Sequence, residues 1–265
     1  MTGRLAPTPS GHLHLGNALA FGAAWLSAKN AGGTLLLRVE DLDRGRARTE
    51  VAEAQRDDLC WLGLGWDAEV PPQSRRDYPL DGLDVYRCDC PRSKRLEAAC
   101  ACRDRSAASG AWRVRLPPGP VQFVDRARGL VTVVLGPADD PVVRRADGEA
   151  AYPLAVVLDD ARDGVTEVVR GGDLLEATAV QLRIAAMLGL TPPTWLHVPL
   201  LVGPDGRKLG KSHGSTSIRE LRAAGWGPDD VWRVLLPMLG VAPGTPLVEA
   251  RLDPTAVAAG PIRVG

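Results

Sequence analysis

The sequence has no long run of apolar residues. Although 45% of its 265 residues are hydrophobic, stretches such as Leu15 to Leu26 are broken by glycine and polar residues well short of a bilayer span. The N-terminus also lacks a basic stretch followed by an apolar core, which is the pattern of an export signal. These absences argue against a membrane protein and against secretion, and they predict a cytoplasmic protein.

Net charge is also absent, because 32 basic residues balance 32 acidic ones. The balance fails locally, since residues 87–115 contain eight basic and three acidic side chains. A neutral chain with one basic segment could hold a polyanion such as RNA at that segment without being coated by it. A solvated arginine-rich loop is the alternative that charge alone leaves open.

Lysine is scarce. Only four of the basic residues are lysines, and two of them, Lys208 and Lys211, lie within four residues of each other. Three of the four histidines fall in two short segments, His12 and His14 near the start and His213 just beyond Lys211. This concentration indicates two segments where an ammonium group or an imidazole is specifically needed.

Strand and helix patterns alternate along most of the chain. Apolar strand-like stretches at 3–6 and 34–39 alternate with helical spacing over 16–31 and 49–62. After a middle region, the pattern resumes with the apolar stretches 154–158 and 165–169, a helix over 174–188 and a strand over 195–202. This order is typical of a doubly wound parallel α/β sheet, a Rossmann-like fold.

The middle region and the end of the chain differ from this pattern. Stretches 121–124, 130–135 and 141–145 have strand and turn signals without helical crossovers, which predicts an inserted antiparallel subdomain. Two short helical stretches at 217–224 and 228–239 follow. We therefore expect a Rossmann-like domain in two halves, 1–85 and 152–214, an insertion at 86–151, and a short helical C-terminal region at 215–265.

Two motifs carry the candidate chemistry. In the first, RLAPTPSGHLHLGN over residues 4–17, a strand ends in a Pro/Gly turn and leads into a helix, whose free N–H groups and dipole favour an anion. His14 could donate to a phosphate oxygen, and Gly16 would leave room for a base. In the second, GPDGRKLGKSHG over residues 203–214, a glycine-rich loop presents two lysines suited to phosphates. Together the motifs predict that a nucleoside triphosphate is bound between them.

The cysteines form a third group. Cys88, Cys90, Cys100 and Cys102 fall within fifteen residues, a density that in a cytosolic protein indicates a tetrahedral zinc site more readily than disulfides. Thiols without metal, or the remnant of a lost site, are the alternatives. The fifth cysteine, Cys60, is expected to lie in the core on an apolar helix face.

The chain resembles class I aminoacyl-tRNA synthetases. Residues 14–17 (HLGN) are similar to the HIGH signature and residues 208–212 (KLGKS) to the KMSKS signature. The flanking blocks LLLRVEDLDRGR, AYPLAVVLDD, GVTEVVRGGDLL and HVPLLVGPDGRKLGKSHG resemble the glutamyl branch. Because only residues 215–265 follow the second motif, too few for an anticodon-binding domain, the chain looks most similar to the short glutamyl-queuosine tRNA(Asp) synthetases.

This resemblance implies a set of site residues. Glutamate would be bound by Arg4, Ala6, Thr8, Glu40, Tyr152 and Arg170, with arginines on the carboxylates and Glu40 on the ammonium group. ATP, accompanied by Mg²⁺, would contact His14, Gly16, Asn17, Asp173, Lys208 and Lys211, with His14 and Lys211 as the catalytic pair. Family members bind zinc with three cysteines and a tyrosine, and here Cys88, Cys90 and Cys102 match while Cys100 would be the fourth ligand. The family loop usually has serine where this chain has Gly210.

The resemblance also implies an activity. Such enzymes activate glutamate with ATP without tRNA, and they transfer it to the queuosine base in the anticodon loop of tRNA(Asp). Two alternatives remain open. The chain could be a glutamyl-tRNA synthetase-like core that activates glutamate for another acceptor, or a catalytically idle RNA-binding paralogue.

Overall fold

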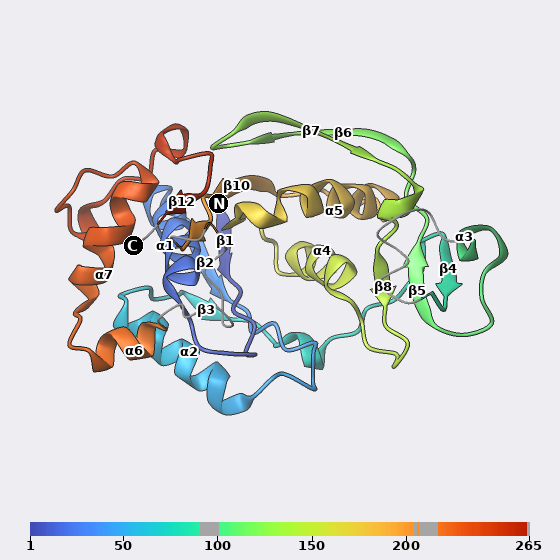
Figure 1. Cartoon of the computed structure of the whole chain (residues 1–265), viewed down its shortest axis with the longest axis horizontal. Coiled ribbons are helices and arrows are strands. Elements are labelled where there is room, and N and C mark those ends of the chain that lie inside the picture. Colours follow the sequence, from blue (N-terminus) through green and yellow to red (C-terminus); the bar gives the residue numbers. More distant parts are fainter. Residues whose placement is uncertain (91–100, 204–205, 207–216, 264–265) are drawn as a thin grey trace.

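The computed structural model of the chain describes residues 1–90, 101–203, 206 and 217–263 (Figure 1). The helices are α1 (Leu15–Asn30), α2 (Thr49–Trp61), α3 (Cys102–Arg105), α4 (Tyr152–Arg162), α5 (Leu175–Met187), α6 (Ile218–Ala223) and α7 (Pro228–Leu235). The strands are β1 (Thr2–Leu5), β2 (Thr34–Leu37), β3 (Ala68–Glu69), β4 (Val85–Cys88), β5 (Ala111–Val114), β6 (Gly119–Asp125), β7 (Gly129–Leu135), β8 (Val142–Arg144), β9 (Glu167–Gly171), β10 (Thr194–Val198), β11 (Leu201–Val202) and β12 (Ile262–Arg263). Within these residues, no helix is both long and apolar enough to cross a membrane.

Two parallel sheets meet at the centre of the molecule. One has the order β1-β2-β3, and in the other β9, β10 and β6 are parallel. The backbone N–H of Thr166 donates to the carbonyl of Thr2 at 2.9 Å, which places the start of β9 beside β1. The chain therefore runs outward in both directions from β1 and β9, which confirms the predicted doubly wound α/β fold. In such folds the crevice at the carboxyl ends of the two central strands binds ligands.

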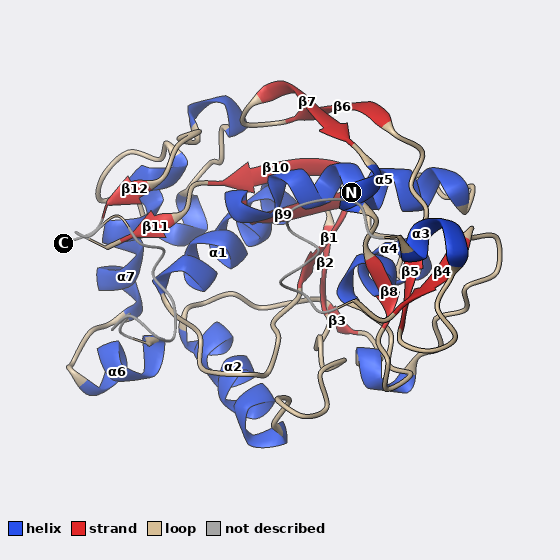
Figure 2. Cartoon of the chain, turned by 45° about the vertical axis from the view of Figure 1, so that its right-hand side comes forward, coloured by secondary structure: helices blue, strands red, loops and turns tan. Residues whose placement is uncertain are grey.

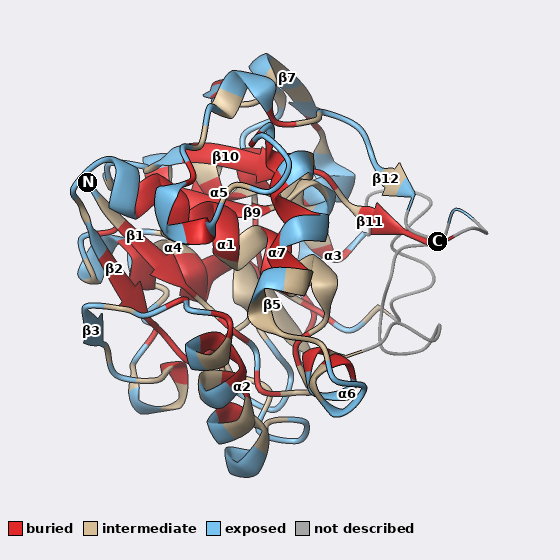
Figure 3. Ribbon diagram, turned by 90° about the vertical axis from the view of Figure 1, so that its left-hand side faces the viewer, coloured by how far each residue is buried: buried red, intermediate tan, exposed pale blue. Residues whose placement is uncertain are grey.

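Helix α1 packs between this sheet and the C-terminal helices (Figure 3). A Cβ atom at Gly22 would lie only 2.6 Å from a ring carbon of Trp232 in α7, so the indole ring needs a glycine beneath it. The Trp232 indole N–H donates to the Leu62 carbonyl at 2.8 Å, which satisfies its polar atom inside the core. The predicted short helical C-terminal region is thus part of the same core as the first half of the sheet.

The middle of the chain divides between two places (Figure 2). Strands β4, β5 and β8 form an antiparallel sheet beside α3. Of the three stretches with strand and turn signals, only 141–145 contributes to this sheet, as β8. The β6–β7 hairpin instead joins the main sheet, because Asp125 of β6 pairs with Trp195 of β10. The predicted insertion at 86–151 thus contributes two strands, β6 and β7, to the main sheet. The division of the chain into four segments stays a prediction.

Several local predictions were wrong. The stretch 154–158, taken with 165–169 as resumed sheet pattern, lies inside helix α4. The strand expected over 195–202 is split into β10 and β11, because Pro199 has no N–H to donate to a sheet. Cys60 is exposed and not in the core. The tail after Gly240, which has no clear sequence pattern, supplies β12, which pairs with β11.

Candidate active site

A cavity of about 280 Å³ opens at the carboxyl ends of β1 and β9, at the topological switch point of the sheet. The predicted site residues that line it are Arg4, Ala6, Thr8, His14, Gly16, Asn17, Glu40, Tyr152, Arg170 and Asp173. The two lysines of the second motif, Lys208 and Lys211, lie outside the described residues. The structure therefore brings every described member of the predicted glutamate and nucleotide sets to one place.

Arg4 lies at the end of β1 and is nearly buried. Its Nε donates to Asp160 Oδ1 and one Nη1 proton donates to the Val169 carbonyl, both at 3.3 Å. The other three N–H groups of its guanidinium have no acceptor within the described part of the chain. Arg4 is thus a fixed cation with unused donors facing a cavity, which is what a carboxylate ligand requires.

Glu40 follows β2, and its backbone N–H donates to the Pro7 carbonyl in the turn after β1. Its carboxylate lies 3.4 Å from Nη2 of Arg38, a fully buried arginine that also contacts Asp160 at 2.7 Å. Burial raises the pKa of Glu40, although Arg38 and Arg4 oppose the shift. An incoming ammonium group would favour the ionised carboxylate, so Glu40 is suited to bind a cationic ligand group.

Arg170 on β9 is held quite differently from Arg4. All five of its N–H groups have protein acceptors, namely His197 Nε2 (3.2 Å), Tyr152 Oη (3.2 Å), Gln181 Oε1 (2.9 Å), the Leu174 carbonyl (3.1 Å) and Thr178 Oγ1 (2.7 Å). Burial lowers the pKa of Arg170. Arg170 therefore has no unused N–H to donate to a ligand. It acts on the cavity through its charge and through the Tyr152 hydroxyl, which accepts from Arg170 and keeps its own proton to donate.

His14 is the N-cap of α1. Its Nδ1 accepts from the backbone N–H of Gly16 at 3.1 Å, and Asn17 Oδ1 accepts from the His14 N–H at 3.1 Å, a capping box. In this structure the backbone N–H groups of both Gly16 and Asn17 donate to His14 Nδ1, so the expected binding of an anion at this helix start stays a prediction. A Cβ atom at Gly16 would lie 3.0 Å from the His14 ring, so this glycine makes room for the imidazole. In the neutral ring the proton is on Nε2.

The residues that flank the lysine segment lie near His14. Leu201 of β11, before the segment, lines the cavity. Ser217, just after it, forms a β-bridge with His14, and the Ile218 N–H donates to the Leu13 carbonyl at 2.8 Å. Described residues on both sides of the second motif therefore lie next to the first motif or its cavity.

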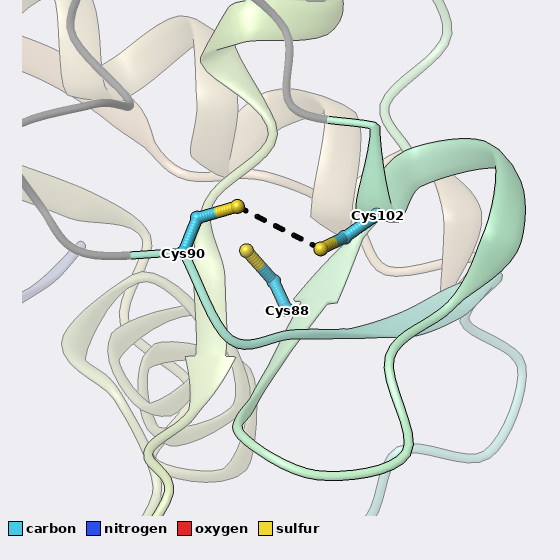
Figure 4. Close-up of side chains that lie close together, drawn as sticks. All are labelled: Cys88, Cys90 and Cys102. Carbon is cyan, nitrogen blue, oxygen red and sulfur yellow. Dashed lines mark hydrogen bonds between the residues drawn. The ribbon is translucent and has the colours of Figure 1, made fainter.

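Three cysteines converge at the tip of the antiparallel sheet (Figure 4). The Sγ atoms of Cys88, Cys90 and Cys102 lie within 4.8 Å of one another, and those of Cys90 and Cys102 are 3.7 Å apart. Two sulfurs on a tetrahedral zinc ion, each about 2.3 Å from it, lie about 3.8 Å apart. The three thiols thus fit a metal ion, whereas Cys100 lies outside the described residues. Burial raises the pKa of Cys102 to about 12, so without a cation this thiol is protonated.

The basic segment around these cysteines is tied into the subdomain itself. Described partners of its arginines are Trp112 under Arg87, Asp140 for Arg103 and Arg113, Asp89 for Arg105, and Asp84 for Arg115. Asp140 is 1% exposed and also accepts from the Leu116 N–H and the Tyr86 hydroxyl. These arginines therefore stabilise the insertion through buried and surface pairs, a role that sequence counting did not predict.

Two buried networks behind the cavity were not predicted. One joins Arg38 and Arg76 to Asp159 and Asp160 of helix α4 and to Asp163, the residue just after it. The other joins Asp125 to His197 at 2.7 Å, and through it to Arg170. The sequence signal for the first network was the presence of charged residues in the largely apolar blocks LLLRVED and AVVLDD. For the Asp125–His197 network, the only sequence signal was that His197 is the one histidine outside both motifs.

The fold and site together define the class of protein. A family model described as "tRNA synthetases class I (E and Q), catalytic domain" matches residues 1–88 and 90–244. A solved glutamate-tRNA synthetase from Elizabethkingia anophelis superposes with a TM-score of 0.85 at 24% identity, covering 100% of this chain and 68% of that one. At that identity the superposition supports the fold alone.

Closer relatives narrow the class. A glutamyl-Q tRNA(Asp) synthetase from Nitratidesulfovibrio vulgaris is 42% identical over 289 residues, covering 91% of this chain and 87% of the relative. One from Symbiobacterium thermophilum is 39% identical over 272 residues, covering 87% of this chain and 84% of the relative. The chain therefore belongs to the glutamyl-Q tRNA(Asp) synthetase family within the class I tRNA synthetases, and it is a ligase of the glutamyl-tRNA synthetase type.

Proposed function

We propose that this enzyme activates glutamate with ATP in the absence of tRNA and transfers the glutamyl group to the queuosine base of tRNA(Asp). The observation that carries the proposal is the shared cavity, in which a cation with unused donors, a buried carboxylate and the His14 cap lie together. The proposed acceptor follows from the similarity to glutamyl-Q tRNA(Asp) synthetases.

In this proposal the glutamate site is electrostatically complementary to a zwitterion with an extra carboxylate. Arg4 binds a carboxylate through its unused N–H groups, and Tyr152 donates its hydroxyl proton with Arg170 behind it. Glu40 binds the ammonium group. Ala6 and Thr8, in the turn after β1, complete the wall of the cavity.

The nucleotide occupies the side of the cavity formed by His14, Gly16, Asn17 and Asp173. Lys208 and Lys211 belong to the segment that ends at Ser217, beside His14. A glutamate carboxylate oxygen attacks the α-phosphorus, a new P–O bond forms and the bond to the pyrophosphate oxygen breaks. Since a carboxylate is already ionised at neutral pH, the reaction needs alignment and charge stabilisation and no general base. Mg²⁺ bound to ATP would offset part of the charge of the leaving pyrophosphate.

The decisive experiment combines two assays. Purified enzyme should catalyse glutamate-dependent ATP–pyrophosphate exchange without tRNA. It should also transfer labelled glutamate to tRNA(Asp) that contains queuosine, and not to tRNA(Asp) lacking queuosine or to tRNA(Glu). Exchange without this transfer would favour another acceptor, and no exchange would favour the idle RNA-binding paralogue.

We also propose that the cysteine cluster binds a structural zinc ion through Cys88, Cys90 and Cys102, with Cys100 as the expected fourth ligand. The 3.7 Å separation of the Cys90 and Cys102 sulfurs supports a tetrahedral thiolate site. Arg105 Nη2, 3.6 Å from Cys102 Sγ, would help to stabilise the thiolate form.

Substituting Cys102→Ser should therefore reduce bound zinc from stoichiometric to background levels. We expect the melting temperature to fall by about 4–10 °C, which corresponds to roughly 2–3 kcal/mol for a domain of this size. Metal analysis of reduced protein and thermal unfolding measure the two effects. Cys60→Ser is the matched control, because Cys60 is exposed and distant in sequence from the cluster. Equal zinc content in the wild type and the Cys102 variant would rule the site out.

A further inference from the structure

His197 on β10 lies directly behind Arg170 and does not line the cavity. Its side chain is completely buried, and its Nε2 accepts from Arg170 Nε at 3.2 Å and contacts Thr178 Oγ1 at 3.1 Å. The His197 and Trp195 rings are stacked, and the Arg170 guanidinium lies 4.6 Å from the centre of the Trp195 ring. His197 is therefore in contact with the charged group of the cavity wall without being able to reach a ligand.

Asp125 fixes the protonation of this imidazole. Its Oδ2 accepts from both the His197 backbone N–H at 3.0 Å and ring Nδ1 at 2.7 Å, and its Oδ1 accepts from the Ala127 and Arg128 N–H groups at 3.0 Å. A carboxylate with four such contacts can only accept from Nδ1, so the ring proton is on Nδ1 and Nε2 is an acceptor. The histidine tautomer follows from the hydrogen-bond partners on both sides of the ring.

Arg170 is held by neutral groups only. Every acceptor that holds its guanidinium is electrically neutral: an imidazole, two hydroxyls, an amide and a backbone carbonyl. A carboxylate in place of His197 would neutralise the positive charge of Arg170. A hydrogen-bond donor in that place would face the N–H groups of Arg170 and repel them. A neutral acceptor at this point keeps the orientation of Arg170 and leaves its positive charge for a ligand.

We propose that His197, locked by Asp125 as a neutral acceptor, is a positioning residue that holds Arg170 and Tyr152 in place to bind the anionic group of the amino-acid substrate. The role rests on the proposed function, because it is expressed through glutamate binding. Because Asp125 is the last residue of β6, its contact with His197 also links the β6–β7 hairpin to β10.

The test compares three variants by ATP–pyrophosphate exchange. His197→Leu removes the acceptor and should raise the KM for glutamate by about 10- to 100-fold, the effect of one charge-assisted hydrogen bond, with little change in kcat or in the KM for ATP. His197→Gln supplies an amide oxygen near the Nε2 position and should recover the KM to within about 5-fold of the wild type. Leu196→Val is the control, because Leu196 is equally buried on β10 but packs into the opposite core.

The results for these three variants distinguish a positioning role of His197 from a purely structural one. An unchanged glutamate KM in His197→Leu, no recovery in His197→Gln, or an equal effect in Leu196→Val would each overturn it. No exchange by the wild type would contradict the proposed function itself. A second readout needs no substrate: with four histidines in the chain, ring ¹⁵N spectra of the wild type can be assigned by loss of one signal in His197→Gln. We expect an unprotonated Nε2 at neutral pH, and a protonated Nε2 would also overturn the proposal.

Discussion

Replacing Arg38 by methionine should lower the free energy of unfolding by about 3–5 kcal/mol, because it leaves buried carboxylates without their counter-charge. Arg38 is 0% exposed and lies 2.7 Å from Asp160, 3.0 Å from Asp163 and 3.4 Å from Glu40. Burial alone would lower the pKa of Arg38, but Asp160 and Glu40 outweigh it and the pKa is raised, so the arginine stays charged. A loss of this size is a large part of the ~5–15 kcal/mol that stabilises a typical domain.

Urea unfolding of the two proteins at neutral pH measures the effect. Arg233→Met is the matched control, since the Arg233 side chain is 64% exposed and its 2.7 Å pair with Asp230 is solvated. We expect that variant to lose less than about 1 kcal/mol. The difference between wild type and Arg38→Met should shrink as the pH falls, because burial raises the pKa of Glu40 and its protonation removes one of the charges that Arg38 compensates. A cost near that of the control would mean that the buried network does not depend on Arg38.

Local sequence pattern was sufficient for the fold, because the apolar periodicity is strong where the sheet is buried. The helix over 49–62 and the strands around 34–39 and 165–169 are close to α2, β2 and β9. The apolar pattern did not predict where a strand ends or whether a short apolar stretch is a strand or a helix. Pro199 ends β10 inside an otherwise apolar run, and the apolar side of 154–158 fits a helix face as well as a strand.

Within the candidate site, the sequence identified which of the described residues line the cavity but not what each side chain contacts there. Both Arg4 and Arg170 were expected to bind carboxylates. Among the described residues, however, three N–H groups of Arg4 have no acceptor, whereas all five of Arg170 have one. That difference depends on acceptors from α5 and β10, which no local pattern links to β9. The Asp125–His197 contact spans 72 residues and was invisible for the same reason.

From the contrast between the two arginines we expect Arg4 to contribute more than Arg170 to the proposed glutamate binding. We expect Arg4→Met to raise the KM for glutamate by about 10²- to 10³-fold, the cost of removing one partner from a desolvated charge pair. The fold should survive, because Asp160 keeps its 2.7 Å contact with Arg38. Glutamate titrations in the exchange assay, with urea unfolding alongside, measure both effects.

Arg4→Lys distinguishes the forked geometry from the charge alone. Lysine keeps the positive charge but has no planar fork with which to hold Asp160 and a ligand carboxylate together, so it should recover only part of the affinity. Full recovery would mean that Arg4 acts as a point charge, and its position at the end of β1 would then matter more than its donors. A normal KM for glutamate in Arg4→Met would instead indicate that the substrate carboxylate is bound by the Tyr152 hydroxyl, with the charge of Arg170 behind it. The three N–H groups of Arg4 that have no acceptor in the described part of the chain would then have no ligand to explain them.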